Sequence, residues 1–298
     1  MPFELPIVNR KAASGMYHFM MDGCRGFRSR FDHIQLIQEI LEEVPEKLGL
    51  RPAMPAFLLP YYNSVVPEDC GVSAFVFLQG GHFTLHTFSF REAYFADLVA
   101  PSVFDYKRLR MLLEAAFPCE TTTVSVVERT GGSAIHVEPD VAADFGPHVF
   151  LDVEQYRGPR TMDALFELFD RLPSEIGMTP IMRPYVIRGT DPSGRSVLSA
   201  MAMIAESHVS VHLFREEGTA YFDLFSCRFF DRAVIVPQIR SQIPGTIVGE
   251  RLIARGSKYR TLRTERSSEL ARSKTWLNAI GDERGGAVFD PTGPTRLE

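Results

Sequence analysis

Several features that would assign the chain to a broad class are missing from it. No stretch approaches the 18 uncharged apolar residues of a membrane-spanning helix, and Met1–Ala13 lacks the apolar segment of a secretion signal. Positive charge is not in excess either, because the net charge is -5 and the pI is about 5.9. We therefore expect neither nucleic acid nor a membrane as a partner, and a cytoplasmic location.

Cysteine is scarce, and its spacing fits no metal or redox motif. The four cysteines, Cys24, Cys70, Cys119 and Cys227, form no CxxC pair and have no partner at the intervals of a metal site. Free thiols in a reducing compartment are the expectation.

What the chain does contain is an internal repeat. Placing Ser73–Asp105 over Ser199–Asp231 without a gap, at an offset of 126, gives nine identities where chance would give about two. The identical pairs are Ser73/Ser199, Ala74/Ala200, His82/His208, His86/His212, Phe88/Phe214, Asp97/Asp223, Leu98/Leu224, Phe104/Phe230 and Asp105/Asp231. Nine matches in one register indicate a duplicated unit.

Each half predicts the same order of elements: a short strand, an amphipathic helix, a hairpin of two or three strands, a second helix and a last strand. The expected ranges are Met16–Asp22, Phe31–Leu50, Tyr106–Ala116 and Thr121–Glu128 in the first half, and His148–Asp152, Met162–Met178 and Ala233–Gln242 in the second. Pro45/Pro173 and Gly49/Gly177 also recur, at an offset of 128. Pro237 interrupts the last of these helices and makes it the weakest prediction.

The connections are too short for parallel crossovers, which favours antiparallel sheets with helices on one face. Two such halves would bury their bare sheet faces against each other. We therefore predict an α+β fold, a four-layer αββα sandwich, with an N-terminal repeat over residues 1–140 and a C-terminal repeat over residues 141–298. Ile135–Gly146 is the expected linker, and the polar segment beyond Tyr259 holds one possible helix around Ser268–Ile280.

One segment of the second copy concentrates reactive side chains. Glu206–His212 reads Glu-Ser-His-Val-Ser-Val-His, and Cys227 follows fifteen residues after the last histidine. At the matching positions of the first copy, Gly81 replaces Ser207 and Pro101 replaces Cys227. Only the second copy keeps the serine and the thiol.

The paired histidines do not suit a single zinc ion. Alternation along a strand puts His82 and His86 on one face, and likewise His208 and His212. Four residues of strand separate the two imidazoles by about 13 Å, whereas the ligands of one zinc lie about 2 Å from it. No metal site is expected. Taken singly, each histidine could be a hydrogen-bonded sheet residue and Cys227 a buried inert thiol.

Together these residues resemble a known family. The segment Glu206–His212, followed by Asp223–Cys227, is similar to the self-processing segment of the pyruvoyl-dependent S-adenosylmethionine decarboxylases of bacterial and archaeal type. The resemblance extends to Gly15–His18 with Asp22, and to Gly146–His148 with Asp152. Members of that family are dimers of one unit or a fused duplication with an αββα fold, and this chain resembles a fused form.

The resemblance implies a chemistry for each residue. Ser207 attacks the carbonyl of Glu206, the peptide bond becomes an ester, and elimination leaves a pyruvoyl group on the new chain that begins at residue 207. That carbonyl forms a Schiff base with a substrate amine and accepts the electrons released by decarboxylation. Cys227 corresponds to the proton donor of the family.

A serine and a histidine assist processing in the family, the histidine as base and the serine by stabilising the oxyanion. Two pairs fit, Ser73 with His86 in the first half and Ser199 with His212 in the second. Because the family site lies between two units, we favour Ser73 and His86. The other pair stays open.

The substrate is expected to be a small amino-acid-type molecule. Phe88, Phe150, Asp152 and Glu154 are the candidate residues lining its pocket. Phe90 stands where the family carries the glutamate that holds the ribose hydroxyls, and Arg228 follows the cysteine where glycine is usual.

Three functions follow. The first is a self-processing S-adenosylmethionine decarboxylase of spermidine biosynthesis, working as a monomeric pseudo-dimer or a homodimer. The second, favoured by Phe90, is a pyruvoyl decarboxylase of another amino acid such as ornithine or arginine. The third is a non-catalytic regulatory pseudoenzyme, which the intact Glu206, Ser207 and Cys227 disfavour.

Overall fold

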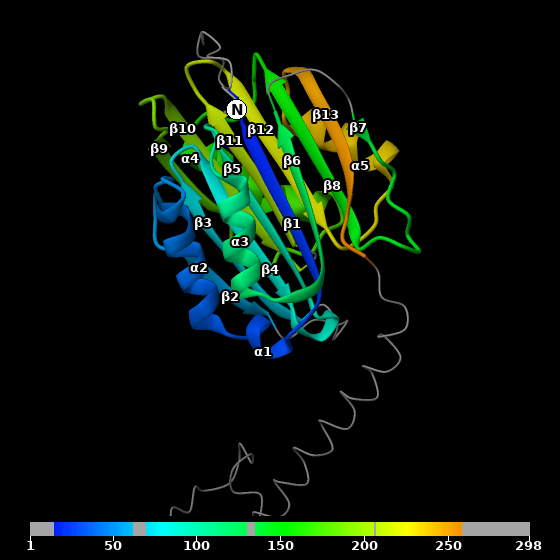
Figure 1. Cartoon of the computed structure of the whole chain (residues 1–298). Helices are drawn as coiled ribbons and strands as arrows, with labels where there is room; N and C mark the ends of the chain where they lie inside the picture. The colour runs from blue at the N-terminus through cyan, green and yellow to red at the C-terminus, as the bar shows by residue number, and fades with distance from the viewer. Residues whose placement is uncertain (1–14, 62–69, 130–134, 206, 258–298) are drawn as a thin grey trace, which may run out of the picture. The chain divides into compact units, whose positions relative to one another are not determined.

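A computed structural model describes residues 15–61, 70–129, 135–205 and 207–257 (Figure 1). The helix predicted around Ser268–Ile280 lies outside this part of the chain, as do Met1–Ala13 and Glu206. Within it, no helix combines the length and apolarity required to cross a bilayer.

The two halves share six strands and two helices in the same order, while the short helix Arg28–Phe31 and the 3₁₀ turn Ser89–Arg91 occur in the first half alone and the strand Ile135–His136 in the second alone among the described residues. In the first half the elements are β1 (Tyr17–Gly26), α1 (Arg28–Phe31), α2 (Ile34–Lys47), β2 (Phe57–Tyr61), β3 (Gly71–Leu78), β4 (Gly81–Phe88), the 3₁₀ turn η2 (Ser89–Arg91), β5 (Ala93–Ala100), α3 (Tyr106–Ala116) and β6 (Cys119–Glu128). In the second half they are β7 (Ile135–His136), β8 (Gly146–Glu154), α4 (Met162–Glu175), β9 (Tyr185–Thr190), β10 (Ser196–Ile204), β11 (Ser207–Phe214), β12 (Thr219–Ser226), α5 (Arg232–Gln242) and β13 (Thr246–Arg255).

The sheets repeat one topology. The first has the order β2-β3-β4-β5-β1-β6, and the second continues β9-β10-β11-β12-β8-β13, with β7 added beside β13. Within both hairpins, residues paired in the first half match those paired in the second: Ser73 lies opposite His86, and Ser199 opposite His212. The predicted duplication therefore extends to strand order and register.

The helices form because each has an apolar stripe and defined ends. Helix α2 buries Ile37, Ile40, Leu41 and Val44, and α4 buries Leu165, Leu168, Phe169 and Leu172. After each helix the backbone turns at a glycine with positive φ, 75° at Gly49 and 73° at Gly177, the conformation that glycine adopts most easily at a helix end. Asp105 and Asp231, paired in the sequence repeat, cap the next helices, α3 and α5, by accepting a backbone N–H.

The layers follow from strand alternation. One face of the first sheet packs on α2 and α3, and one face of the second packs on α4 and α5, each over an apolar core (Figure 1). The remaining faces meet each other and carry histidine, aspartate and arginine at their centre, flanked by smaller apolar clusters. The predicted four-layer αββα sandwich is confirmed.

Two details differ from the sequence expectation. The predicted linker is not wholly irregular, because Ile135–His136 pairs with Arg251–Leu252 and adds a parallel strand at the edge of an otherwise antiparallel sheet. A helix runs through Pro237 over Arg232–Gln242. Ile235, Val236 and Ile239 bury against the second sheet, and this packing offsets the hydrogen bond that proline cannot make.

Candidate active site between the two sheets

Ser207 lies at the first position of β11, at one end of the inter-sheet layer. Its φ of 151° falls in a region that non-glycine residues rarely adopt and that costs about 1–3 kcal/mol. The side chain is 1% exposed, and its Oγ has no hydrogen-bond partner among the described residues. A strained residue with an uncommitted hydroxyl is the arrangement expected of a nucleophile poised for reaction.

His86 reaches this end of the layer from the opposite sheet. Its Nε2 lies 2.8 Å from Nδ1 of His208, the residue that follows Ser207. Its Nδ1 lies 2.9 Å from Oγ of Ser73, the residue opposite it on β3. The first half thus brings a serine and histidine pair to the residue adjoining the Ser207 hydroxyl.

The second serine and histidine pair lies at the other end of the layer. Nδ1 of His212 is 2.8 Å from Oγ of Ser199, and Nε2 of His212 is 2.8 Å from Nδ1 of His82. His212 stands five residues along β11 from Ser207, which corresponds to about 16 Å of strand. Ser73 and His86 therefore lie at the end of the layer where β11 begins with Ser207, and Ser199 and His212 do not.

The first half has no room for a serine at the equivalent position. A Cβ atom at Gly81 would lie 1.9 Å from the carbonyl oxygen of Val99, far inside any real contact. Next to it, a Cβ at Gly80 would meet Asp191 at 3.0 Å and Pro101 at 3.1 Å. The end of the layer that holds Ser199 and His212 is therefore closed to a processing residue.

Cys227 adjoins Ser207 through strand pairing. Ser207 pairs with Ser226, the last residue of β12, so the half-buried thiol of Cys227 follows directly at the same end. Gly146 permits this arrangement, since a Cβ there would lie 2.9 Å from Cα of Cys227. Serine and thiol thus share one end of the sandwich.

An aromatic cluster surrounds His86 at this end. Phe95 packs 5.2 Å from Phe225 and 4.1 Å from Phe145 between ring centroids, and Phe88 packs 5.2 Å from Phe145. Phe225 also approaches His86 at 6.2 Å. Of the predicted substrate residues, Phe88 is the one that belongs to this end.

The other three predicted substrate residues lie elsewhere. Phe150 is fully buried against His18 and His148, and Asp152 binds both Arg129 and Arg251, at 2.7 and 2.6 Å. Asp152 pairs with Tyr221, six residues before Cys227, or about 20 Å along the strand. Glu154 is exposed beyond it.

Each half contributes an arginine that forms an ion pair with a buried aspartate of the other half. Arg255 of the second half binds Asp22 at 2.6 Å and Asp97 at 2.7 Å in the first half. Reciprocally, Arg129 of the first half binds Asp152 at 2.7 Å in the second. These ion pairs fix how the two sheets face each other and thereby place His86 beside His208.

Burial controls the protonation of this layer. It lowers the pKa of His86 and His82 well below their ordinary range, and that of His212 to about 3. Burial would raise the pKa of Asp97, but Arg255 and the hydrogen bond of His18 outweigh it and hold that pKa well below the usual value. His82, His86 and His212 are therefore neutral, while the Asp97 carboxylate is charged.

Arg255→Met is expected to lower the free energy of unfolding by about 3–5 kcal/mol, because Asp22 and Asp97 would be left as buried charges without their partner. Urea denaturation followed by circular dichroism measures the loss. The matched control is Arg110→Met, which removes an exposed pair with Glu114 and should cost less than about 1 kcal/mol. Equal losses in the two variants would contradict the structural role of Arg255.

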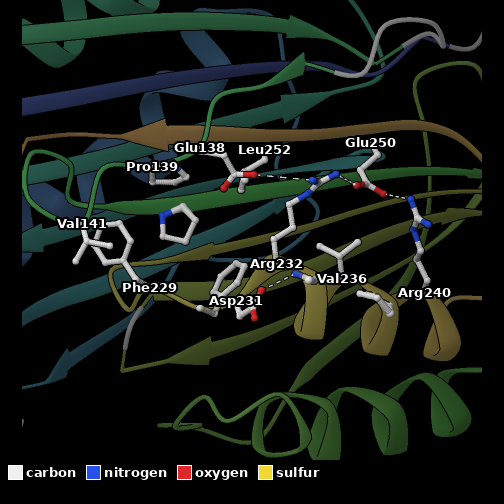
Figure 2. A pocket seen from close by; sticks show the side chains of 14 residues that line it. Glu138, Pro139, Val141, Phe229, Asp231, Arg232, Val236, Arg240, Glu250 and Leu252 are labelled. Carbon is white, nitrogen blue, oxygen red and sulfur yellow. Dashed lines mark hydrogen bonds and ion pairs between the residues drawn. The ribbon is translucent and has the colours of Figure 1, made fainter.

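A pocket of about 710 Å³ lies over the second sheet beside α5. Phe229, which stands two residues after Cys227 in the sequence, is one of its lining residues. Figure 2 shows Arg232 between Glu138 and Glu250, and Arg240 on the far side of Glu250. Ser207, His86 and Cys227 do not line this pocket. The pocket is therefore separate from these three candidate residues.

Histidines of facing sheets come within reach of one another. His82, His208 and Asp223 offer ligand atoms within 4.8 Å of one another, and so do His18, Asp97 and His148. The expectation that no metal binds rested on two histidines of a single strand, and that geometry still excludes them as ligands of one ion. The separation of about 13 Å along one strand says nothing about an ion held by histidines of two facing sheets.

Fold and site together define a class: a duplicated αββα sandwich in which one half supplies a strained serine and a thiol, and the other a serine and histidine pair. A family model described as S-adenosylmethionine decarboxylase matches residues 17–130 and again residues 148–256. The chain belongs to the S-adenosylmethionine decarboxylase family, and the two matched segments agree with a tandem duplication.

Individual relatives match one unit's length of the chain. An S-adenosylmethionine decarboxylase proenzyme of Symbiobacterium thermophilum is 28% identical over 116 residues, which are 38% of this chain and 84% of the relative. The crystal structure of the adenosylmethionine decarboxylase from Aquifex aeolicus is 17% identical, with a TM-score of 0.34, over 39% of this chain and 91% of that structure.

Sequence reasoning missed Arg129 and Arg255. They stand 126 positions apart, the offset of the repeat, but beyond the aligned window. Extending the same register by 24 residues past Asp105 and Asp231 would have found them. The aromatic cluster gave no comparable signal, because Phe95 and Phe225 have no phenylalanine at their matching positions, Tyr221 and Val99.

Proposed function

We propose that the chain is a self-processing pyruvoyl-dependent decarboxylase, with S-adenosylmethionine as the substrate and spermidine biosynthesis as the pathway. The observation that carries the proposal is Ser207, which is strained, buried and uncommitted at its Oγ, and whose neighbour in the chain, His208, contacts a histidine of the other half. The active unit is one chain acting as a pseudo-dimer, since both halves contribute to the same end of the sandwich.

The residues fit a pyruvoyl group made from Ser207. Its Oγ is free of hydrogen bonds within the described part of the chain, so nothing there holds it back from the Glu206 carbonyl. Once formed, the pyruvoyl group supplies a carbonyl that serves as an electron sink for decarboxylation. The half-buried Cys227, which follows the strand partner of Ser207, donates a proton to the carbon that loses carboxylate.

His86 and Ser73 assist the cleavage from the first half. His86, kept neutral by burial, accepts the proton that Ser207 loses during attack. Ser73, hydrogen-bonded to His86, donates its hydroxyl toward the oxyanion that develops. Ser199 and His212 take no part, because about 16 Å of strand separates His212 from Ser207.

A second candidate substrate class is supported by Phe90. The Arg28 guanidinium lies 3.9 Å from the Phe90 ring centroid, so this position presents a cation over an aromatic ring rather than a carboxylate. A phenylalanine at this position has no carboxylate to hold ribose hydroxyls, which favours a substrate without a ribose, such as ornithine or arginine. Cleavage at Ser207 is common to both candidates.

Release of labelled carbon dioxide distinguishes the substrates. Purified full-length chain is incubated with carboxyl-labelled S-adenosylmethionine, ornithine or arginine, and the Cys227→Ala variant is the control. We expect release from S-adenosylmethionine, reduced by about 100-fold or more in Cys227→Ala. Release from ornithine or arginine alone would support the second candidate, and a fully cleaved chain inactive on all three would contradict both.

A further inference from the structure

Four imidazoles form a ring at the centre of the inter-sheet layer that the proposed chemistry does not use. Neighbouring rings meet edge to face with centroids 5.3 to 6.3 Å apart, in the order His18, His82, His208 and His148. Two come from each half of the chain. All four are fully buried.

Three nitrogens of this ring lack hydrogen-bond partners among the described residues: His18 Nδ1, His82 Nε2 and His148 Nε2. A buried polar atom without a partner costs about 1–3 kcal/mol. Of the three, His82 Nε2 belongs to a residue whose ligand atom lies within 4.8 Å of those of His208 and Asp223, which favours a ligand that accepts an electron pair from imidazole.

The buried aspartates and arginines of the layer do not balance in charge. Its aspartates outnumber its arginines by one: Asp22, Asp97, Asp152 and Asp223 against Arg129, Arg251 and Arg255. Burying an uncompensated carboxylate is costly. The excess charge needs a positive partner.

The excess falls on Asp223. Its symmetry counterpart, Asp97, has Nη1 of Arg255 at 2.7 Å, whereas the nearest approach of Arg129 to Asp223 is 3.8 Å. Arg129 instead donates to the carbonyl oxygens of Leu151 and Phe222. Of the two His–Asp sets, the one built on Asp223 is therefore the one short of positive charge.

We propose that His82, His208 and Asp223 bind a divalent first-row transition ion such as zinc, held between the two sheets. Imidazole nitrogen and carboxylate oxygen are ligands that suit such ions. His208 Nε2 lies 3.2 Å from Asp223 Oδ2, and two ligands of a tetrahedral zinc lie about 3.3 Å apart. A ring nitrogen of His82 lies within 4.8 Å of these two ligand atoms and supplies the third ligand.

The surroundings hold these ligands in place. Asp223 accepts a 2.6 Å hydrogen bond from Ser210 at Oδ1, which leaves Oδ2 directed to the imidazoles. His82 and His208 use their Nδ1 atoms to contact His212 and His86 across the layer. Such outer partners orient the ligands of most metal sites.

The ion would determine where the protons of this layer sit. With Nε2 of His208 on the metal, its Nδ1 would carry the proton and point it at Nε2 of His86, the nitrogen that must be released from this hydrogen bond before His86 can act as the proposed base. His86 then carries its own proton on Nδ1 and donates to Ser73. A structural ion would thus fix the orientation of the histidine next to Ser207 without touching the substrate.

Metal content of the full-length chain tests the proposal. The protein is stripped with a chelator, reloaded with zinc or cobalt(II), dialysed and measured by plasma mass spectrometry, with cobalt absorption reporting the ligand geometry. We expect one ion per chain and a four-coordinate cobalt spectrum. Asp223→Asn and His82→Gln should weaken binding by about 100-fold or more.

Asp97→Asn is the matched control, because it makes the same change at the symmetry-related carboxylate that Arg255 already neutralises. It should bind the ion like the unaltered chain, and circular dichroism verifies that each variant is folded. X-ray absorption of the zinc-loaded unaltered chain, which needs no variant, should show two imidazole ligands. No stoichiometric binding, a zinc shell without imidazole, or loss of the ion in Asp97→Asn but not in Asp223→Asn would each overturn the proposal.

Discussion

Ser207→Ala is expected to abolish self-cleavage completely and leave a single chain of 33.5 kDa. Alanine has no hydroxyl to attack the preceding carbonyl, so neither the ester nor the pyruvoyl group can form. Denaturing mass spectrometry after overnight incubation measures the outcome, and decarboxylation should be lost together with cleavage.

Ser199→Ala is the matched control for this variant. Ser199 is also a buried serine of the second sheet, but it contacts His212 at the far end of the layer. It should be cleaved as fast as the unaltered chain. Cleavage of Ser207→Ala at the same bond would rule out the serine mechanism.

His86→Asn is expected to slow self-cleavage by about 100-fold or more, the usual contribution of a general base. His86 is the imidazole that the other half brings to the residue beside Ser207. A time course of intact mass on freshly purified precursor gives the rate. Circular dichroism should show the folded state retained, because the Arg255 and Arg129 ion pairs that join the sheets are untouched.

His212→Asn makes the same change at the symmetry-related position. This residue contacts Ser199 and His82, about 16 Å of strand from Ser207, and its loss should change the rate less than tenfold. The opposite order, with His212→Asn slow and His86→Asn fast, would contradict the assignment between halves and return Ser199 and His212 to the site.

Under the proposed function, the duplication explains why self-processing would take place at one end of the layer rather than at both. Both ends of the layer keep a serine and histidine pair, but a side chain at Gly81 would strike the Val99 carbonyl. At the other end the equivalent position holds Ser207. In the proposed mechanism the first half supplies His86 and Ser73, and the second supplies Ser207 and Cys227.

Much of the fold was predictable because its signals are local or periodic. The nine identities in one register predicted the duplication, and the apolar periodicity predicted helices over Phe31–Leu50 and Met162–Met178, which the structure ends earlier, at Lys47 and Glu175. Strand alternation put His82 and His86 on one face. These features depend on neighbours in the chain, which a single sequence displays.

The site was less predictable because its contacts cross between sheets. Alternation places His86 and His208 on inner faces, but how the faces meet depends on ion pairs such as Arg255 with Asp22, which lie 233 positions apart. For the same reason the sequence could not show that Asp152 is occupied by two arginines. The φ of Ser207 likewise has no signature in residue type.

Intact mass of the freshly purified full-length chain under denaturing conditions tests the central claim most directly. We expect two chains, residues 1–206 and a chain of residues 207–298 whose N-terminus is a pyruvoyl group and resists Edman degradation. A single uncut chain of 33.5 kDa, unchanged after prolonged incubation, would contradict self-processing and favour a non-catalytic role.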